Sequence, residues 1–122
     1  MKLLLHNLLE CNIKGVENGY PLKIEARKVE VKEADFQADF LKRMLQRLDW
    51  SALVQGAKAM GVPDLPEQYR PEMADDEAFL RALHHALLEV HLEEGALICP
   101  ESGRRFEVKD GVPNMKLAED EV

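Results

Sequence analysis

The chain has 122 residues, of which 46% are hydrophobic and 32% are charged; this is enough apolar material for a small core, but there is no run of about 20 apolar residues to cross a membrane. Its net charge of -7 argues against a protein that holds nucleic acid by itself, because phosphate binding requires clustered Lys and Arg side chains. Two cysteines and no recognisable secretory signal favour a reducing compartment, so we expect a cytoplasmic and nuclear protein.

The acidic residues are concentrated in the middle of the chain. Residues 33–95 hold thirteen acidic and six basic side chains, which accounts for the whole net charge of -7. The two flanking segments together are neutral. This distribution favours two lobes, one made of residues 1–34 with residues 96–122 and the other made of residues 35–95.

The first expected elements are strands. Leu3 and Leu5 alternate with their neighbours, which predicts a short first strand. Residues 21–31 also alternate, with a change of phase near Arg27 that a bulge or bend would produce.

The middle segment predicts three helices. Apolar side chains recur every three or four residues over 36–48, 50–60 and about 76–94, as expected when one face of a helix is buried. Candidate N-caps and C-terminal glycines flank these ranges: Asp35, Asp49 or Ser51, Asp75 or Asp76, Gly61 and Gly95. We therefore expect a helical lobe inserted between the two chain ends.

Strand signals return after residue 95. Residues 96–99 and 104–109 flank a turn, and a second turn leads to a last strand over residues 112–117. Pro113 in this strand marks an edge, which can recruit a partner, although a solvated edge is the simpler interpretation of the pattern alone. The simplest assembly is an α+β fold in which strands from both chain ends form one small antiparallel sheet.

No catalytic apparatus is visible in the sequence. There is no glycine-rich phosphate loop, HExxH zinc motif or nucleophile motif. His84 and His91 lie about 10.5 Å apart on a helix, too far to share one ion. His85 and Glu89 can face one another, a spacing typical of a solvated helix face. We expect no catalytic residues and no cofactor.

Residues 99–103, with the sequence Cys-Pro-Glu-Ser-Gly, resemble the Cys-x-x-Cys-Gly knuckle of a zinc ribbon. Ser102 replaces the second thiol, and Cys11 has no second cysteine near it because Val16 stands there. Two thiolates do not close a tetrahedral zinc site, so we expect a ribbon-like turn held by packing, without metal. The sequence leaves open whether Cys11 and Cys99 meet.

Six segments carry a family resemblance over essentially the whole chain. They are Met1-Lys2-Leu3-Leu4 with His6-Asn7, Asp49-Trp50, residues 84–89 (His-His-Ala-Leu-Leu-Glu), Glu94-Gly95, residues 99–104 and residues 111–115 (Gly-Val-Pro-Asn-Met). In this order they resemble the small activator subunit of class I methyltransferases, also called the multifunctional methyltransferase subunit.

The resemblance implies a zinc-ribbon-like lobe built from both chain ends with an inserted helical lobe. Family members have no activity of their own. They bind, stabilise and activate S-adenosylmethionine-dependent class I methyltransferases that modify tRNA, ribosomal RNA and translation termination factors. Each enzyme is expected to bind in turn as a heterodimer, through strand addition and an apolar interface, with no nucleic-acid binding by the subunit alone and no membrane association.

The resemblance also places the partner-binding residues. They are Leu3, Leu5 and Asn7 near the start of the chain and Pro113, Asn114, Met115 and Leu117 near its end. Lys116 departs from the family, where leucine is usual, and we expect its side chain to face solvent. Some relatives bind zinc through four cysteines, at positions occupied here by Cys11, Val16, Cys99 and Ser102, so half of that site is missing.

Two other functions are weighed. An RNA-binding zinc-ribbon-like module would use Arg104 and Arg105, and steep salt dependence would distinguish it from an apolar protein interface. A small hydrolase using His84 or His85 has no nucleophile or oxyanion donor to support it.

Overall fold

The protein is built around one antiparallel sheet. The structure, a computed structural model, describes residues 1–122. The sheet has four strands in the order β1-β2-β3-β4. They are β1 (Lys23–Val31), β2 (Val90–Ile98), β3 (Arg105–Lys109) and β4 (Val112–Pro113). The expected α+β fold, with strands from both chain ends in one sheet, is confirmed, while the zinc-ribbon-like detail stays a prediction.

The longest pairing joins β1 to β2. It extends from Lys23 opposite Ile98 to Val31 opposite Val90, and its register shifts on both sides of Lys28. The change of phase expected near Arg27 is therefore an irregularity of the ladder, in which Arg27 is an extra residue in β1 and Glu93 is an extra residue in β2.

Four α-helices cover the sheet and extend beyond it. They are α1 (Leu3–His6), α2 (Ala38–Leu45), α3 (Trp50–Ala59) and α4 (Glu77–His84), with a π-helical turn over His85–Glu89 and 3-10 turns at Pro71–Asp75 and Glu119–Glu121. The carboxylates of Asp49 and Asp76 cap α3 and α4 by accepting backbone N–H groups, as expected. Asp35 does not cap α2, because Gln37 occupies that position.

The strand expected near residue 3 is wrong, because these residues form α1. Leu3 and His6 are one helical turn apart, and both are buried. They pack against Gly56 of α3, where an added Cβ would lie 2.9 Å from Leu3 Cδ2 and 3.2 Å from His6 Nδ1. The missing side chain of Gly56 therefore allows α1 to approach α3 closely.

The third predicted helix is too long at its C-terminal end. Helical structure ends at Glu89, and β2 begins at Val90. Val90 and Leu92 are buried while His91 and Glu93 are half-exposed, which is the two-residue period of a strand. The expected lobe boundary between residues 95 and 96 lies inside this strand.

The last strand is also shorter than expected. Only Val112 and Pro113 pair with β3, and residues 114–117 continue without a strand partner in this chain. The expected turn at residues 110 and 111 is present, with positive φ angles of 51° at Asp110 and 77° at Gly111.

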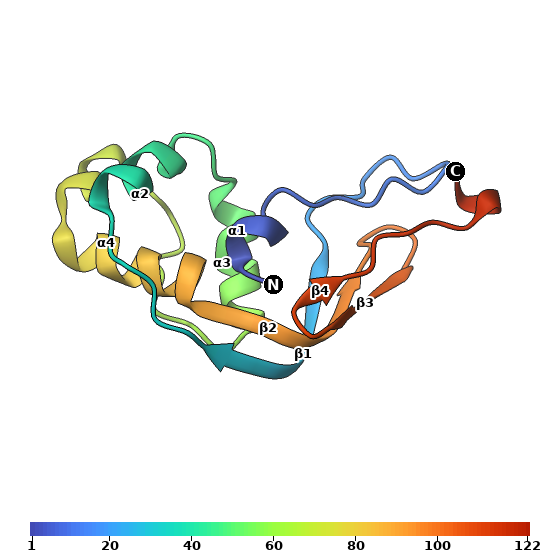
Figure 1. The fold of residues 1–122 in the computed structure, drawn as a ribbon. Helices are drawn as coiled ribbons and strands as arrows, with labels where there is room; N and C mark the ends of the chain where they lie inside the picture. Colours follow the sequence, from blue (N-terminus) through green and yellow to red (C-terminus); the bar gives the residue numbers. More distant parts are fainter.

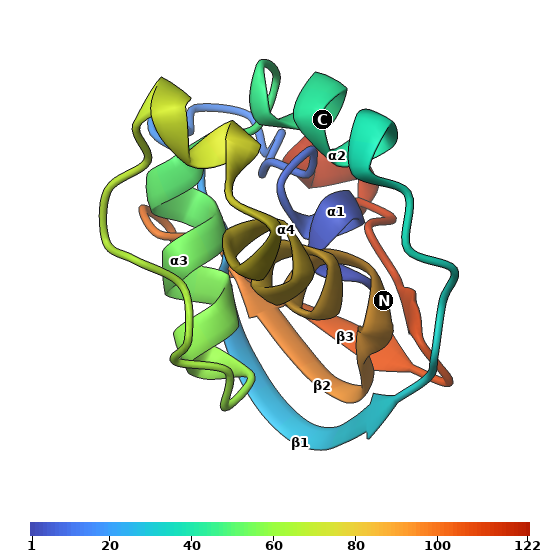
Figure 2. The same ribbon diagram turned by 90° about the vertical axis from the view of Figure 1, so that its left-hand side faces the viewer.

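One hydrophobic core connects the helical and sheet regions. It contains 23 buried residues from the four α-helices, the π-helical turn, strands β2 and β3, and the segments that connect them. In Figure 1, α2 and α4 lie at one end of the molecule, β3 and β4 at the other, and α1 and α3 between them. Figure 2 shows the molecule from the helical end, with α4 in front of α1, and α1 contacts α3 and the π-helical turn. None of the helices combines the length and apolar character needed to span a membrane.

Candidate functional site

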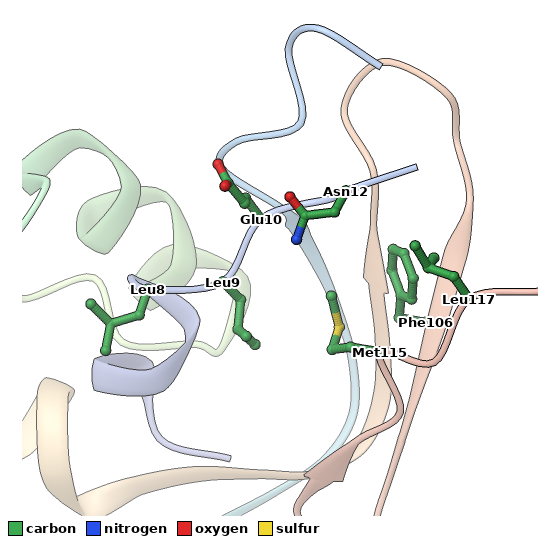
Figure 3. Close-up of a pocket in the computed structure, with 7 residues that line it drawn as sticks. All are labelled: Leu8, Leu9, Glu10, Asn12, Phe106, Met115 and Leu117. Atoms are coloured by element: carbon green, nitrogen blue, oxygen red, sulfur yellow. The ribbon is translucent and has the colours of Figure 1, made fainter. Parts of the chain in front are cut away.

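An apolar groove separates the segment after α1 from the end of the chain. Its lining residues are Leu8, Leu9, Glu10, Asn12, Phe106, Met115 and Leu117. Figure 3 shows Met115 extending toward the residue 8–12 segment, with Leu117 beside the ring of Phe106. Phe106 is buried, whereas Leu8 is 71% exposed, so the groove joins the core to an apolar surface.

Asn7 fixes the direction in which the first wall of the groove leaves α1. Its side-chain amide donates to Asp49 O at 2.9 Å and accepts from Asp49 N at 3.0 Å. Its backbone carbonyl accepts from the Tyr20 hydroxyl at 2.7 Å. These bonds attach the residue 8–12 segment to the start of α3.

The second wall follows β4. The backbone N–H of Asn114 donates to Glu107 O at 2.9 Å, and its side chain accepts from Lys116 N at 3.1 Å. The side chains of Pro113, Met115 and Leu117 are half-buried, and those of Asn114 and Lys116 are exposed. This segment is extended and alternating but has no strand on its outer side, which leaves an open edge.

The structure divides the seven predicted contact residues into two groups. Leu3 is fully buried and Asn7 is 5% exposed, so in the free chain both side chains make their contacts mainly within the fold. The other five are at least partly exposed: Leu5, Pro113, Asn114, Met115 and Leu117. Of these, only Met115 and Leu117 line the groove.

Leu8 and Leu9 line the groove but were not predicted. Both follow Asn7 directly, at the end of a helix too short to bury them. Two adjacent leucines after a short apolar segment are a signal that could have identified this wall.

The residues that correspond to a zinc site do not fit zinc. Cys11 and Cys99 are free, buried thiols, and burial raises the pKa of Cys11. Val16 offers no donor atom, and the backbone N–H of Ser102 already donates to Cys99 Sγ at 3.3 Å. Two thiols and a hydroxyl lack the fourth donor of a closed tetrahedral site.

A carboxylate joins the two loops around these thiols. Glu101 accepts from the backbone N–H groups of Glu17 and Asn18, both at 3.2 Å. Gly103 has a positive φ of 77°, which completes the tight knuckle turn. Side-chain and backbone contacts hold the two loops together where a metal would do so in a zinc ribbon.

The paired histidines fasten the π-helical turn to the loop before α2. His84 Nε2 lies 2.8 Å from Ala34 O, and His85 Nδ1 lies 2.9 Å from Glu89 Oε1. Glu89 also accepts from Ala34 N at 3.1 Å. The hydrogen bond with His85, followed by that with Ala34, holds the pKa of Glu89 below its usual value. Glu89 therefore links two segments of the backbone.

Both arginines of the RNA-binding alternative are paired within the chain. Arg104 Nε lies 2.7 Å from Glu121 Oε2, and its guanidinium stacks 4.9 Å from the centroid of Phe106. Arg105 Nη1 lies 2.7 Å from Glu25 Oε2. These pairings leave little unmatched positive charge for phosphate, which weakens this alternative.

Comparison with known proteins identifies the family. A family model described as Trm112p-like protein matches residues 2–111. The chain is 58% identical to the multifunctional methyltransferase subunit TRM112 homolog A of Arabidopsis thaliana, and the match covers all of both chains. It is 43% identical to the TRM112-like protein of Mus musculus, covering all of this chain and 98% of that relative.

A solved structure has the same fold. It is the E. cuniculi Mtq2–Trm112 complex, described as responsible for methylation of the eRF1 translation termination factor. One of its chains matches with a TM-score of 0.63 and 20% identity over 94% of each chain. The full-length relatives and the match over residues 2–111 together show that this chain belongs to the Trm112p-like family.

Proposed function

We propose that this chain is a non-catalytic subunit that binds, stabilises and activates class I methyltransferases. The observation that carries the proposal is the apolar groove between residues 8–12 and 115–117, beside an open sheet edge. Relatives named as multifunctional methyltransferase subunits support the choice of partner. The proposed enzymes modify tRNA, ribosomal RNA and termination factors, one enzyme at a time, in the cytoplasm and nucleus.

Binding would combine backbone pairing with apolar burial. A partner strand added beside residues 113–117 would use the free edge, as in β-augmentation. Leu5 and Leu8 are exposed at 40% and 71%, and they would extend the apolar contact beyond the groove. Removing these side chains from water on both proteins supplies the main driving force.

Activation would follow from stabilisation of the enzyme. A ligand that binds only the folded form of its partner raises the population of that form by mass action. The polar side chains that line the groove are those of Glu10 and Asn12, and they do not form a pair of catalytic nucleophile and general base. This composition supports a binding role for the groove.

The test is co-expression with a methyltransferase from the same organism. Met115→Lys places a charge inside the apolar interface, so we expect it to abolish or strongly reduce co-purification. Met115 is half-buried at the groove, so the melting temperature of the free subunit should change little.

A matched control adds the same charge elsewhere. Gln68→Lys lies on an exposed loop between α3 and α4 and should leave co-purification unchanged. Full recovery of the enzyme with Met115→Lys would show that the groove is not the interface.

A further inference from the structure

The two cysteines come from opposite ends of the chain and lie on two loops that Glu101 joins. Cys11 is 5% exposed and Cys99 is 2% exposed, and both are free. The proposed subunit function uses neither thiol. Both belong to the same buried cluster of the core, and the backbone N–H of Ser102 donates to Cys99 Sγ at 3.3 Å.

Backbone contacts hold the two loops in this arrangement. Cys11 N donates to Gly19 O at 2.9 Å, and Gly19 packs so closely against the Cys11 backbone that a side chain there would collide with it. Cys99 N donates to Arg104 O at 2.9 Å, and Cys99 O accepts from Gly103 N at 3.0 Å. The carboxylate of Glu101 then joins the loops directly through Glu17 and Asn18.

We propose that Cys11 and Cys99 form a reversible intramolecular disulfide when the chain meets a hydroperoxide. The observation behind this assignment is that two free, buried thiols lie on loops that the Glu101 carboxylate fastens together. A disulfide requires the two side chains to approach without large backbone movement, and the hydrogen bonds of Glu101 to Glu17 and Asn18 limit the movement of the two loops relative to each other.

The reaction balances with hydrogen peroxide as the oxidant. The Cys99 sulfur attacks one peroxide oxygen, the O–O bond breaks, and water leaves with sulfenic acid on Cys99. The Cys11 sulfur then attacks the Cys99 sulfur, the S–O bond breaks, and a second water leaves as the S–S bond forms. Two thiols lose two electrons and two protons in total, and one peroxide becomes two waters.

The hydrogen bonds around the thiols favour Cys99 as the first nucleophile. Burial tends to raise the pKa of Cys99, but hydrogen bonds from the Ser102 hydroxyl and backbone outweigh it and lower the pKa. Burial raises the pKa of Cys11. The thiolate is the reactive form, so Cys99 reacts first and Cys11 resolves the sulfenic acid.

Oxidation would act on the groove through the chain itself. Cys11 lies between Glu10 and Asn12, two residues of the first groove wall. Drawing Cys11 into a covalent bond with Cys99 would shift this wall relative to Met115. This consequence rests on the proposed function, whereas the disulfide can be measured on the free chain alone.

The experiment treats the purified full chain with hydrogen peroxide, then unfolds it in the presence of an alkylating agent. We expect the intact mass to fall by two hydrogens with no cysteine alkylated, a peptide map linking Cys11 to Cys99, and full reversal by dithiothreitol. Two alkylated cysteines, or disulfide-linked dimers in place of the internal link, would overturn the proposal.

Variants test the order of the two steps. Cys11→Ser should accumulate a Cys99 sulfenic acid that dimedone traps, and Ser102→Ala should slow the oxidation of Cys99. The rate of sulfenic acid trapping is compared between the two single variants. If Cys11 in the Cys99→Ser variant is trapped as fast as Cys99 in the Cys11→Ser variant, the assigned order is wrong. The principal measurement uses the unaltered chain, so it does not depend on the folding of any variant.

Discussion

Replacing Asn7 with alanine should destabilise the free chain, because Asn7 works inside the fold. The change removes the bond donated to Asp49 O and the bond accepted from Asp49 N, at 2.9 and 3.0 Å. Each lost bond costs about 1 kcal/mol net, and leaving the part-buried N–H of Asp49 unpaired adds to this, whereas Asp49 O keeps its bond from Leu53 N, so we expect a loss of roughly 2–4 kcal/mol. For a domain of this size the melting temperature would fall by on the order of 10 °C.

Urea unfolding followed by Trp50 fluorescence measures this loss. Trp50 is the single tryptophan and begins α3 next to Asp49, so it reports on the region that Asn7 holds. Asn12→Ala is the matched control, because Asn12 is exposed, and its effect should stay within about 0.5 kcal/mol. An equally small effect of Asn7→Ala would refute the structural role assigned to Asn7.

Three further predictions concern the packing and the loops. Gly56→Val should lower the melting temperature by several degrees, since even a Cβ would lie 2.9 Å from Leu3 Cδ2, whereas an unchanged melting temperature would contradict the close α1–α3 approach. Burial lowers the pKa of His6 in the folded chain. The contribution of neutral His6 to stability should therefore be fully present above the pKa of an unfolded histidine, about 6.5, and should be lost as the pH falls through the lower pKa of the folded chain. Urea midpoints measured across that pH range test this prediction. The midpoint should depend less on pH in the His6→Gln variant than in the unaltered chain, and an equal dependence would contradict the prediction. Glu101→Ala should speed amide exchange at Glu17 and Asn18, and unchanged exchange would remove the proposed loop tether.

Features with a local chemical cause could be predicted from the sequence. Asp49 and Asp76 cap helices because their carboxylates reach nearby backbone N–H groups. The bulge near Arg27 follows from a break in side-chain alternation. Each of these features depends on residues within a few positions of one another.

The errors arose where distant residues decide the structure. Residues 3–6 are too few to show a period, and their helix depends on packing against Gly56 in another helix. Residues 90–94 fit both a helical and a strand pattern, and pairing with β1 selects the strand. Residues 114–117 alternate as a strand does, but no neighbouring strand is present to pair with them.

The candidate site was only partly predictable for the same reason. Met115 and Leu117 follow a turn whose residue types are visible in the sequence, and they line the groove as half-buried apolar side chains. The residue types of Leu3 and Asn7 do not reveal whether their side chains are exposed. The docking of α1 onto α3 buries both. Leu8 is assigned no role from the sequence. It lines the groove, and its large apolar side chain is 71% exposed.

The most direct test of the central claim is affinity capture of the tagged chain from its own cells in high salt, followed by mass spectrometry. If the chain is a methyltransferase subunit, several class I methyltransferases should be recovered, together in an amount near-equal to that of the chain, because an apolar interface resists salt. Recovery of RNA without an enzyme, lost as the salt concentration rises, would contradict the account and favour a nucleic-acid-binding module.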